Sequence, residues 1–526
     1  MLSARPQALR LFLLAITATL VVWSQGAVAA SASPSARAAK QCQGPDKAQC
    51  QADNQRREHL EQLREQNAHQ KRPNVIVIQT DDQNVGDMFV MQQTLALLGA
   101  RGTSFDNSYV SYPLCCPSRA TFLTGQYAHN HRVLTDQRYG DLDNSNTLAV
   151  WMRQAKYRTA LVGKYVNGYG VVYPREIPPG WTQWFALTGG TDQKRYRYNL
   201  NENGKLRYYR GGARNYVTDV LSSKVNLLLK QWTPSPKPFF LYFAPTAPHG
   251  ERAVPVSSSR DPEPAPRHLG TFGDILNPRT PNYNEEDVSD KPEAVRKLPL
   301  LSDADLADLD RRYRGRLESL LSVDDEVKKI VGLVRKYGDK RKTFFVFTSD
   351  NGLEMGAHRI KFKNYLYEEG ERVPLIIRGP GFPAGVTRQQ LVSNIDLAPT
   401  ITALTGAQPA RVMDGIPLLP LAKNPAEAAN RDLLFESFDL GESNFQEQAF
   451  GIRRGQWAYN EYAPDDGGAL YNHAELYNLN ADPYELNNLL YDPLGPTDPS
   501  PADLVLASQL SARLAQLKTC SGASCN

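Results

Sequence analysis

The chain has 526 residues, of which 41% are hydrophobic and 22% charged, so it has enough apolar surface for a folded core and is not disordered throughout. The length predicts two or three folding units. The 60 Lys and Arg residues against 56 Asp and Glu residues give a net charge of only +4, without a dense basic block, which argues against nucleic acid or an anionic membrane as partner.

The first residues have the pattern of a secretory signal peptide. Arg5 and Arg10 precede the apolar stretch Leu11–Trp23, and the small residues Ala27-Val28-Ala29 follow it. We therefore predict that residues 1–29 are a signal peptide of an exported protein, the alternative being an uncleaved anchor. No other window is long and apolar enough to span a bilayer, so no integral membrane segment is expected after signal removal.

Export permits disulfides, and the six cysteines fall into three close pairs. We predict the bridges Cys42–Cys50 and Cys520–Cys525, with cross-pairing of the two ends left open because sequence does not fix connectivity. Adjacent cysteines rarely form a disulfide with each other, so Cys115 and Cys116 need another explanation.

Residues 30–72 are small and then highly charged, which predicts a linker and a solvated helical segment. From Pro73, short apolar runs alternate with longer amphipathic stretches, which is typical of an α/β domain, here over 73–425, with a large, mainly parallel sheet sandwiched by helices. Five continuous apolar runs are predicted as buried strands: Asn74–Ile78, Thr159–Val162, Phe239–Phe243, Thr343–Thr348 and Leu375–Arg378.

Three further segments complete the predicted organisation. Gly250–Leu301 is polar, Pro-rich and aperiodic, which indicates a functional or mobile loop. A long helix, in one or two pieces, is expected from a capping box at Ser302 to a stop at Gly338. Residues 426–526 are predicted to be a smaller α+β unit with short antiparallel strands, turn signals at Asp465–Gly468 and a final helix over Pro501–Lys518.

Polar residues follow four of the predicted strands. They are Asp81 and Asp82, then Lys164, then His249, then Asp350 and Asn351. Ligands of open α/β sheets bind outside the carboxyl ends of the strands, so we expect these groups to converge there. The oxygen donors among them suit a hard cation such as Ca²⁺ or Mg²⁺, although either pair alone would also fit a turn or helix cap.

A short helix is predicted to begin at Cys115, because Pro117 suits a first turn and Gly125 suits the position after the end. Its free N–H groups would attract an anion, and Arg119 one turn later could reach the cysteine or an oxyanion. A thiol beside a hard cation is unexpected, since such cations bind sulfur poorly.

The stretch Cys115-x-Pro-Ser-Arg-x-x-x-Leu-Thr-Gly resembles the signature of the type I, formylglycine-dependent sulfatases of the alkaline phosphatase superfamily. In that family a formylglycine-generating enzyme converts the cysteine to formylglycine (3-oxoalanine) during maturation. Further motifs occur in the family's order: Asp81-Asp82, Gly163-Lys164, Ala247-Pro248-His249, Asp350-Asn351-Gly352, Lys363-x-x-x-Tyr367-Glu368 and the C-terminal Glu475–Leu489.

Finer matches resemble the N-acetylglucosamine-6-sulfatase branch. They are Cys115–Arg119, Gln126–His131, Gly163–Asn167, Leu320–Asp325 and Met413–Gly415. The chain departs from many arylsulfatases, which have a histidine two residues after the lysine, where this chain has Val166 and then Asn167. It also lacks any Asn-x-Ser/Thr sequon, so a bacterial exported relative is expected rather than a glycosylated lysosomal enzyme.

The resemblance implies roles for the site residues. Cys115, as a hydrated formylglycine, would be the nucleophile, and Arg119, Lys164 and Lys363 would assist the nucleophile or hold the sulfate. His249 would protonate the leaving alcohol. Asp81, Asp82, Cys115, Asp350 and Asn351 would bind the cation, Ca²⁺ or alternatively Mg²⁺.

Other residues are left with two interpretations. Lys361 competes with Lys363, which is preferred for its spacing to Tyr367. Asn167 and His358 are predicted to bind substrate, with loop capping an equal alternative for His358. Structural roles are favoured for His129 and His131, and Cys116 is expected to be a small buried filler.

The sequence therefore predicts an exported hydrolase of sulfate esters, with the 6-O-sulfate of N-acetylglucosamine in a glycosaminoglycan as the expected substrate. One alternative is a broad arylsulfatase, or a phosphonate or phosphodiester hydrolase, that uses the same nucleophile. The other is an unmodified homologue that binds sulfated glycans without cleaving them.

Overall fold

The structure is a computed structural model that describes residues 72–190, 194–252, 259–337, 342–438, 448–463, 473–491 and 499–526. Several predictions lie outside these residues. They are the signal peptide, nearly all of the 30–72 segment, the Cys42–Cys50 bridge, the helix stop at Gly338 and the turn at Asp465–Gly468.

Four of the predicted strands form the centre of a ten-stranded sheet, as parallel neighbours in the order β11-β1-β8-β4. They are β1 (Asn74–Thr80), β4 (Arg158–Gly163), β8 (Phe239–Ala244) and β11 (Thr343–Ser349). Each is one or two residues longer than predicted. Their near-continuous burial explains why each appears in the sequence as an unbroken apolar run.

Further strands make the sheet mixed. The predicted Leu375–Arg378 is β12 and runs antiparallel beside β11. Beyond it lie β2 (Thr103–Phe105) and β13 (Val386–Arg388), while β5 (Gln183–Thr188), β6 (Tyr198–Glu202) and β7 (Lys205–Tyr209) extend the other edge. These outer strands were not predicted. The mainly parallel, mixed α/β sheet is confirmed.

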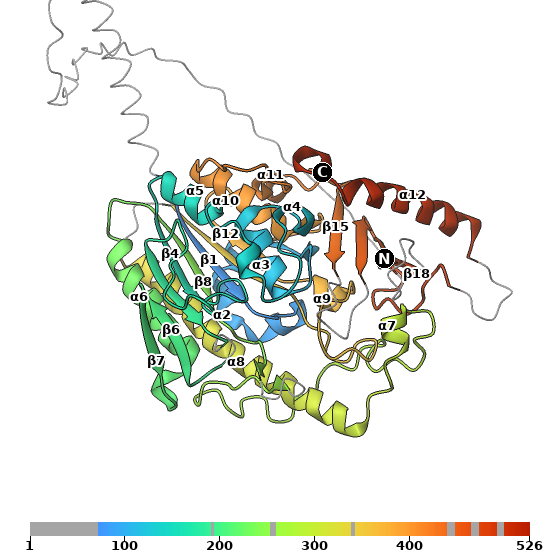
Figure 1. The fold of residues 1–526 in the computed structure, drawn as a ribbon, viewed down its shortest axis with the longest axis horizontal. Helices are drawn as coiled ribbons and strands as arrows, with labels where there is room; N and C mark the ends of the chain where they lie inside the picture. Colours follow the sequence, from blue (N-terminus) through green and yellow to red (C-terminus); the bar gives the residue numbers. More distant parts are fainter. Residues whose placement is uncertain are drawn as a thin grey trace, which may run out of the picture. The chain divides into compact units, whose positions relative to one another are not determined.

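Helices cover both faces of the sheet (Figure 1). Val75 and Val77 of β1 pack in one apolar core and Ile76 and Ile78 in the other, because alternate side chains of a strand point to opposite faces. The first core includes residues of α3 (Cys115–Thr124), α5 (Leu148–Gln154), α10 (Leu397–Thr405) and α11 (Leu418–Lys423). The second includes residues of α6 (Val217–Trp232) and α8 (Asp303–Lys336), against which α2 (Gln92–Leu97) packs.

The predicted long helix is α8, which is continuous over 34 residues. Its capping box is present, since the Ser302 hydroxyl accepts from the Asp305 N–H while the Asp305 side chain accepts from the Ser302 N–H. The preceding 250–301 segment is mostly irregular and contains the short α7 (Glu293–Arg296).

The C-terminal part contains the predicted antiparallel sheet. Its four strands are β15 (Asp432–Ser437), β16 (Ala449–Arg454), β17 (Trp457–Tyr462) and β18 (His473–Asn478). The final helix is α12 (Pro501–Leu517), and Cys520 and Cys525 form the predicted disulfide.

Contacts join this sheet to the segment after α3, which contains the short helix α4 (Ala128–His131). Tyr127 belongs to the same apolar cluster as Leu434 and Leu510. His129 bonds to Glu436 through Nδ1 at 2.7 Å and to the Cys520 carbonyl through Nε2 at 2.9 Å. These two hydrogen bonds hold the His129 side chain between Glu436 and the Cys520 carbonyl.

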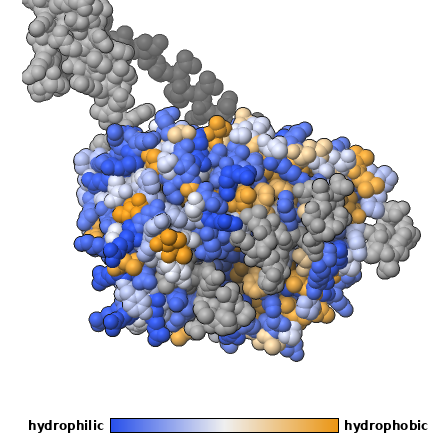
Figure 2. Space-filling view, in the orientation of Figure 1, coloured by the Kyte–Doolittle hydropathy of each residue, from blue (hydrophilic) through white to orange (hydrophobic). Residues whose placement is uncertain are grey.

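The face seen in Figure 2 is largely hydrophilic, with apolar residues scattered between polar ones. Among the described residues, no helix is both long enough and apolar enough to cross a bilayer.

Candidate active site

The helix α3 places Cys115 at its amino end, beside the carboxyl ends of the central strands. Leu114 is the N-cap in an extended conformation, and Gly125 ends the helix with φ of 68°, a left-handed conformation that favours glycine. All ten residues of the helix are buried, so its position is fixed by packing on every side. The predicted helix and both of its ends are confirmed.

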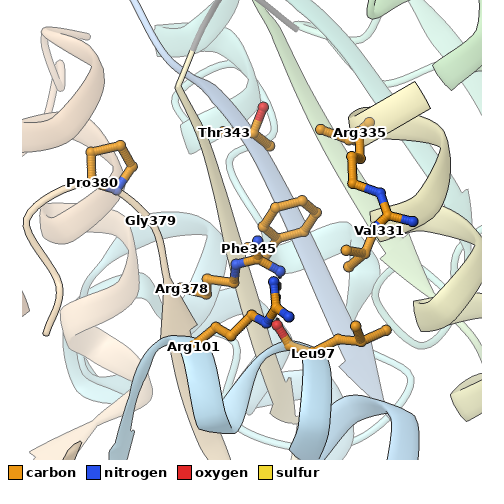
Figure 3. Close-up of a pocket in the computed structure, with 10 residues that line it drawn as sticks. Leu97, Arg101, Val331, Arg335, Thr343, Phe345, Arg378, Gly379 and Pro380 are labelled. Carbon is orange, nitrogen blue, oxygen red and sulfur yellow. Dashed lines mark hydrogen bonds between the residues drawn. The ribbon is translucent and has the colours of Figure 1, made fainter. Parts of the chain in front are cut away.

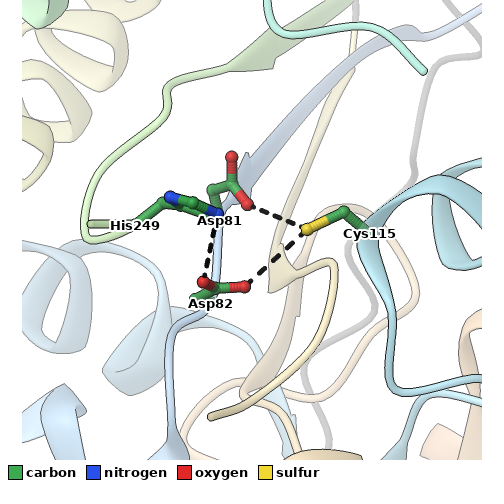
Figure 4. Close-up of side chains that lie close together, drawn as sticks. All are labelled: Asp81, Asp82, Cys115 and His249. Atoms are coloured by element: carbon green, nitrogen blue, oxygen red, sulfur yellow. Dashed lines mark hydrogen bonds and ion pairs between the residues drawn. The ribbon is translucent and has the colours of Figure 1, made fainter. Parts of the chain in front are cut away.

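Cys115 lies within a group of charged side chains (Figure 4). Its Sγ is 3.4 Å from Asp81 Oδ1, 3.8 Å from Asp82 Oδ1 and 2.7 Å from Lys363 Nζ. Burial, followed by the negative charge of Asp350, raises the pKa of the thiol well above its ordinary value despite the nearby lysines. As a thiol, this group stays protonated and is a weak nucleophile.

Three positively charged side chains balance the negative charge of the carboxylates around Cys115. Lys164 Nζ is 2.8 Å from Asp81 Oδ2, and Lys363 pairs with Asp82. Arg119 Nε donates to Asp350 Oδ2 at 2.8 Å, and its Nη2 lies 3.7 Å from Asp81.

The close approach of Lys164 depends on Gly163. Its φ is 126°, and a Cβ there would lie 1.9 Å from the Ala244 carbonyl oxygen of the neighbouring β8. A larger residue would push β4 and β8 apart at the point where both strands enter the site. The Gly163-Lys164 pair therefore has a steric basis.

The two adjacent aspartates remain ionised although they are buried. Burial alone would raise the pKa of Asp81, but Lys164, His249 and the other nearby cations hold it well below the ordinary value. The pKa of Asp82 is likewise lowered against burial, chiefly by Lys363 and His249. For Asp350, burial dominates and raises the pKa in spite of Arg119.

The oxygen donors of the site fit a hard cation. The Asp82 N–H donates to Asp350 Oδ1 at 3.1 Å, and Asn351 Nδ2 donates to Asp82 Oδ1 at 2.7 Å, so the two strand ends are joined. Asn351 Oδ1 is buried and has no hydrogen-bond partner. A buried amide oxygen beside three carboxylates, left without a donor, is suited to a cation such as Ca²⁺ or Mg²⁺.

His249 completes the cluster, because one ligand atom from each of His249, Asp81, Asp82 and Cys115 lies within 4.8 Å of the others. His249 Nδ1 is 2.5 Å from the Gly250 carbonyl, to which only a protonated nitrogen can donate. Its Nε2 lies 3.5 Å from Asp82 Oδ2. The Nε2 atom is therefore the ring nitrogen that faces the cluster.

Two buried arginines hold the strand ends and were not predicted. Arg195 donates to Thr246 Oγ1 at 2.9 Å, to the Thr246 carbonyl at 3.0 Å and to the His249 carbonyl. Arg316 donates to the Asp82 carbonyl at 2.6 Å and to Asp87 at 2.8 Å. The only sequence signal was that Arg316 interrupts the apolar face of α8 between Tyr313 and Leu320.

Other predicted residues lie elsewhere. Lys361 pairs with Asp305 at 2.7 Å rather than with the cluster. His358 is fully buried, bonds to Glu285 at 2.5 Å and packs on Tyr367 with ring centroids 4.3 Å apart. These contacts do not place His358 beside Cys115, and its predicted substrate role remains a prediction.

Three further residues from the sequence analysis are buried, namely Cys116, Asn167 and His131. Cys116 is buried in the first core, as expected of a filler, and its Sγ lies 3.5 Å from the Asn167 carbonyl. Asn167 is buried, and its Oδ1 has no hydrogen-bond partner. His131 bonds to Thr121 at 3.0 Å, which is a structural contact.

Comparison with known proteins identifies the family. A model described as "Sulfatase" matches residues 73–407, and one described as "N-sulphoglucosamine sulphohydrolase, C-terminal" matches residues 356–518. The chain belongs to the sulfatase family. This sulfatase is therefore a hydrolase of sulfate esters.

The sequence similarity to individual relatives extends over most of this sulfatase. It is 32% identical to human N-acetylglucosamine-6-sulfatase over 500 residues, covering 86% of both chains. It is also 32% identical to an arylsulfatase of Volvox carteri, over 87% of this chain and 76% of the relative. A solved structure described as in complex with its substrate, D-glucosamine-2-N,6-O-disulfate, has a TM-score of 0.69 at 24% identity, covering 85% of this chain and 98% of that one.

Proposed function

We propose that this sulfatase is exported and removes the 6-O-sulfate of N-acetylglucosamine in a glycosaminoglycan. The observation that carries the reaction is the position of Cys115, whose sulfur lies 2.7 Å from Lys363 Nζ and beside two ionised aspartates. The similarity to human N-acetylglucosamine-6-sulfatase over 86% of both chains supports the substrate. The pattern of residues 1–29 and the Cys520–Cys525 disulfide support export.

The proposal includes conversion of Cys115 to formylglycine. The Cys115 sulfur then stands in for the oxygens of a hydrated aldehyde, which would supply a nucleophile and, afterwards, a route for releasing sulfate. Two features support this conversion. The buried thiol is neutral, and its neighbours are oxygen donors that suit a hard cation better than sulfur does.

The cation would be held by Asp81, Asp82, Asp350 and Asn351, with Ca²⁺ preferred. When bound, it would supply positive charge that stabilises the sulfate oxygens and the nucleophile. The positively charged side chains of Lys164, Lys363 and Arg119 would add to this charge.

The remaining chemistry belongs to the side chains of the cluster. Lys363 and Lys164 would bind sulfate oxygens and stabilise the negative charge that moves toward the leaving oxygen. Arg119 holds Asp350 in place and would keep the nucleophile acidic through its charge. His249 Nε2 would give its proton to the sugar oxygen as the sulfur–oxygen bond breaks and its electron pair moves to that oxygen.

A broad arylsulfatase is the second candidate, because the Volvox carteri relative is as similar in identity as the human one. The decisive experiment has two parts. The first is the mass of the tryptic peptide Gly102–Arg119 from protein made in a formylglycine-competent host, where we expect the CH₂SH group of residue 115 to be replaced by CHO. An intact thiol in active protein would contradict the nucleophile.

The second part compares kcat/KM on N-acetylglucosamine 6-sulfate, 4-nitrophenyl sulfate and an aryl phosphodiester. The proposal expects the sugar sulfate to be cleaved with the highest kcat/KM. A clear preference for the aryl sulfate would favour the arylsulfatase, and a preference for the phosphodiester would favour the related hydrolase. Cys115→Ala should abolish turnover without changing the melting temperature. Tight glycan binding without turnover by wild type in which Cys115 remains a thiol would support the non-catalytic alternative.

A further inference from the structure

A cavity of about 540 Å³ lies near the amino end of β11, away from Cys115. Figure 3 shows side chains from four separate segments surrounding it. Leu97 and Arg101 come from α2 and the turn after it, Val331 and Arg335 from the end of α8, Phe345 from β11, and Arg378 from β12.

The cavity is distinct from the catalytic cluster. Its wall includes Thr343, the first residue of β11, whereas the site residue Asp350 follows the last residue of that strand. At roughly 3.3 Å per residue, a strand of this length separates its two ends by about 20 Å. A ligand in this cavity would therefore not touch the reacting group.

Three guanidinium groups border the cavity, and none of the described residues that line it is acidic. Within the described part of the chain, Arg101, Arg335 and Arg378 have no carboxylate at ion-pair distance. Most other buried or half-buried arginines here do have one, such as Arg119 with Asp350. Three uncompensated positive charges around one hollow create a positive potential that an anion would relieve.

The half-buried Arg378 is held in place from two sides. Its Nη1 donates to the Leu97 carbonyl at 2.8 Å, and its guanidinium carbon lies 5.5 Å from the centre of the Phe345 ring. Burial lowers the pKa of Arg378, and the positive charge of Arg101 adds to this effect because the two groups repel each other. The cavity thus has one ordered cation at its wall and two exposed ones, Arg101 and Arg335, at its rim.

We propose that this cavity is a second anion site, which binds a ligand carrying sulfate or phosphate groups. Planar guanidinium groups match the paired oxygens of such anions. The volume lies within the range of small-molecule sites, roughly 300–1,000 Å³. Phe345, Val331 and Leu97 add an apolar surface that suits the face of a sugar ring. The anion has two possible sources, a free inorganic ion or a sulfated sugar.

The test measures binding by the full chain without turnover. Lys363→Ala serves as the parent, because it weakens anion binding at the catalytic cluster and leaves the distant cavity intact. Into this parent we would introduce Arg101→Ala with Arg335→Ala. The matched control is Arg153→Ala with Arg214→Ala, which removes two exposed arginines that make no described ion pair. All four positions are exposed, so the variants should fold, and equal melting temperatures would verify this.

Isothermal titration calorimetry with inorganic sulfate should detect one binding site in the parent and in the control. The Arg101→Ala/Arg335→Ala variant should bind sulfate at least about tenfold more weakly, as expected for the loss of charge-assisted hydrogen bonds. Equal affinity in the variant and the control, or no binding to the parent, would overturn the proposal. Because binding is measured without turnover, a wrong substrate assignment would not change this result.

A second titration with N-acetylglucosamine 6-sulfate identifies the source of the anion. Tighter binding than inorganic sulfate, lost with Arg101→Ala/Arg335→Ala, would indicate a sulfated sugar that uses the apolar surface. Equal affinity for both, lost in the same variant, would indicate a free anion. Either result supports an anion site.

Discussion

The ammonium nitrogen of Lys363 lies 2.7 Å from the sulfur of Cys115 and also pairs with Asp82. Lys361, only two residues earlier, pairs instead with Asp305 at a position where both side chains are about one-third exposed. Of these two nearby lysines, Lys363 therefore lies inside the cluster around Cys115 and Lys361 lies outside it.

This difference predicts opposite results for two alanine variants. Lys363→Ala should lower kcat for sulfate ester hydrolysis by about 10²–10³-fold, the loss typical when one group that stabilises developing charge is removed. Lys361→Ala should keep near wild-type kcat and lose at most about 1 kcal/mol of stability, since exposed ion pairs contribute little. Steady-state kinetics on both variants would check this, and a larger loss in Lys361→Ala would reverse the assignment.

Asn351→Ala should weaken cation binding, because Asn351 Oδ1 is the buried oxygen without a partner among the carboxylates. Adding Ca²⁺ to metal-free protein should raise the melting temperature, since a ligand that binds only the folded state stabilises it. The variant should need at least about tenfold more Ca²⁺ for the same rise. The exposed Asn430→Ala is the matched control, and identical Ca²⁺ responses of the two variants would remove Asn351 from the cation site.

The central sheet and the position of the site were predictable from local sequence. The strands β1, β4, β8 and β11 are buried on both faces, so each appears as an unbroken apolar run. Parallel strands bring their carboxyl ends to one edge, which is why Asp81, Lys164, His249 and Asp350 could be expected to meet. That expectation needed no knowledge of the strand order.

The outer strands and supporting residues were not predictable in the same way. Most of β7 is exposed, so it lacks an apolar run, and β2 and β13 have only three residues each. Arg195 acts largely through backbone carbonyls of a distant turn. Such partners carry no side-chain signature, and only the fold brings them together.

A buried carboxyl group on α8 makes stability depend on pH. Glu326 is fully buried, its Oε2 accepts from Asn226 at 3.3 Å, and burial raises its pKa from 4.5 to about 8. Between these values the folded chain holds a proton that the unfolded chain has released. The contribution of Glu326 to the free energy of unfolding therefore falls as pH rises from about 4.5 to about 8 and is constant outside that window.

Glu326→Gln should remove this dependence, since the amide has the shape of the protonated carboxyl group and does not titrate. At pH 8 the variant should be more stable than wild type, on the order of a few kcal/mol, and at pH 4 the two should be equal. Urea unfolding at both pH values would measure the difference. The exposed Glu427→Gln is the control, and an equal effect of both substitutions would contradict the role of burial.

His249→Ala should affect sugar sulfates far more than aryl sulfates. A sugar oxygen is a poor leaving group until it is protonated, whereas a nitrophenolate leaves readily without a proton. If His249 Nε2 supplies that proton, kcat on N-acetylglucosamine 6-sulfate should fall by about 10²–10⁴-fold, with a much smaller loss on 4-nitrophenyl sulfate.

The matched control is His268→Ala, because His268 pairs with Asp325 outside the cluster and should leave both rates unchanged. The ratio of the two losses decides the role of His249. Equal losses on both substrates would mean that His249 acts through its contact with Asp82, by holding the cation site or the sulfate, rather than as the proton donor. A preserved sugar-sulfate rate would remove His249 from the reaction altogether.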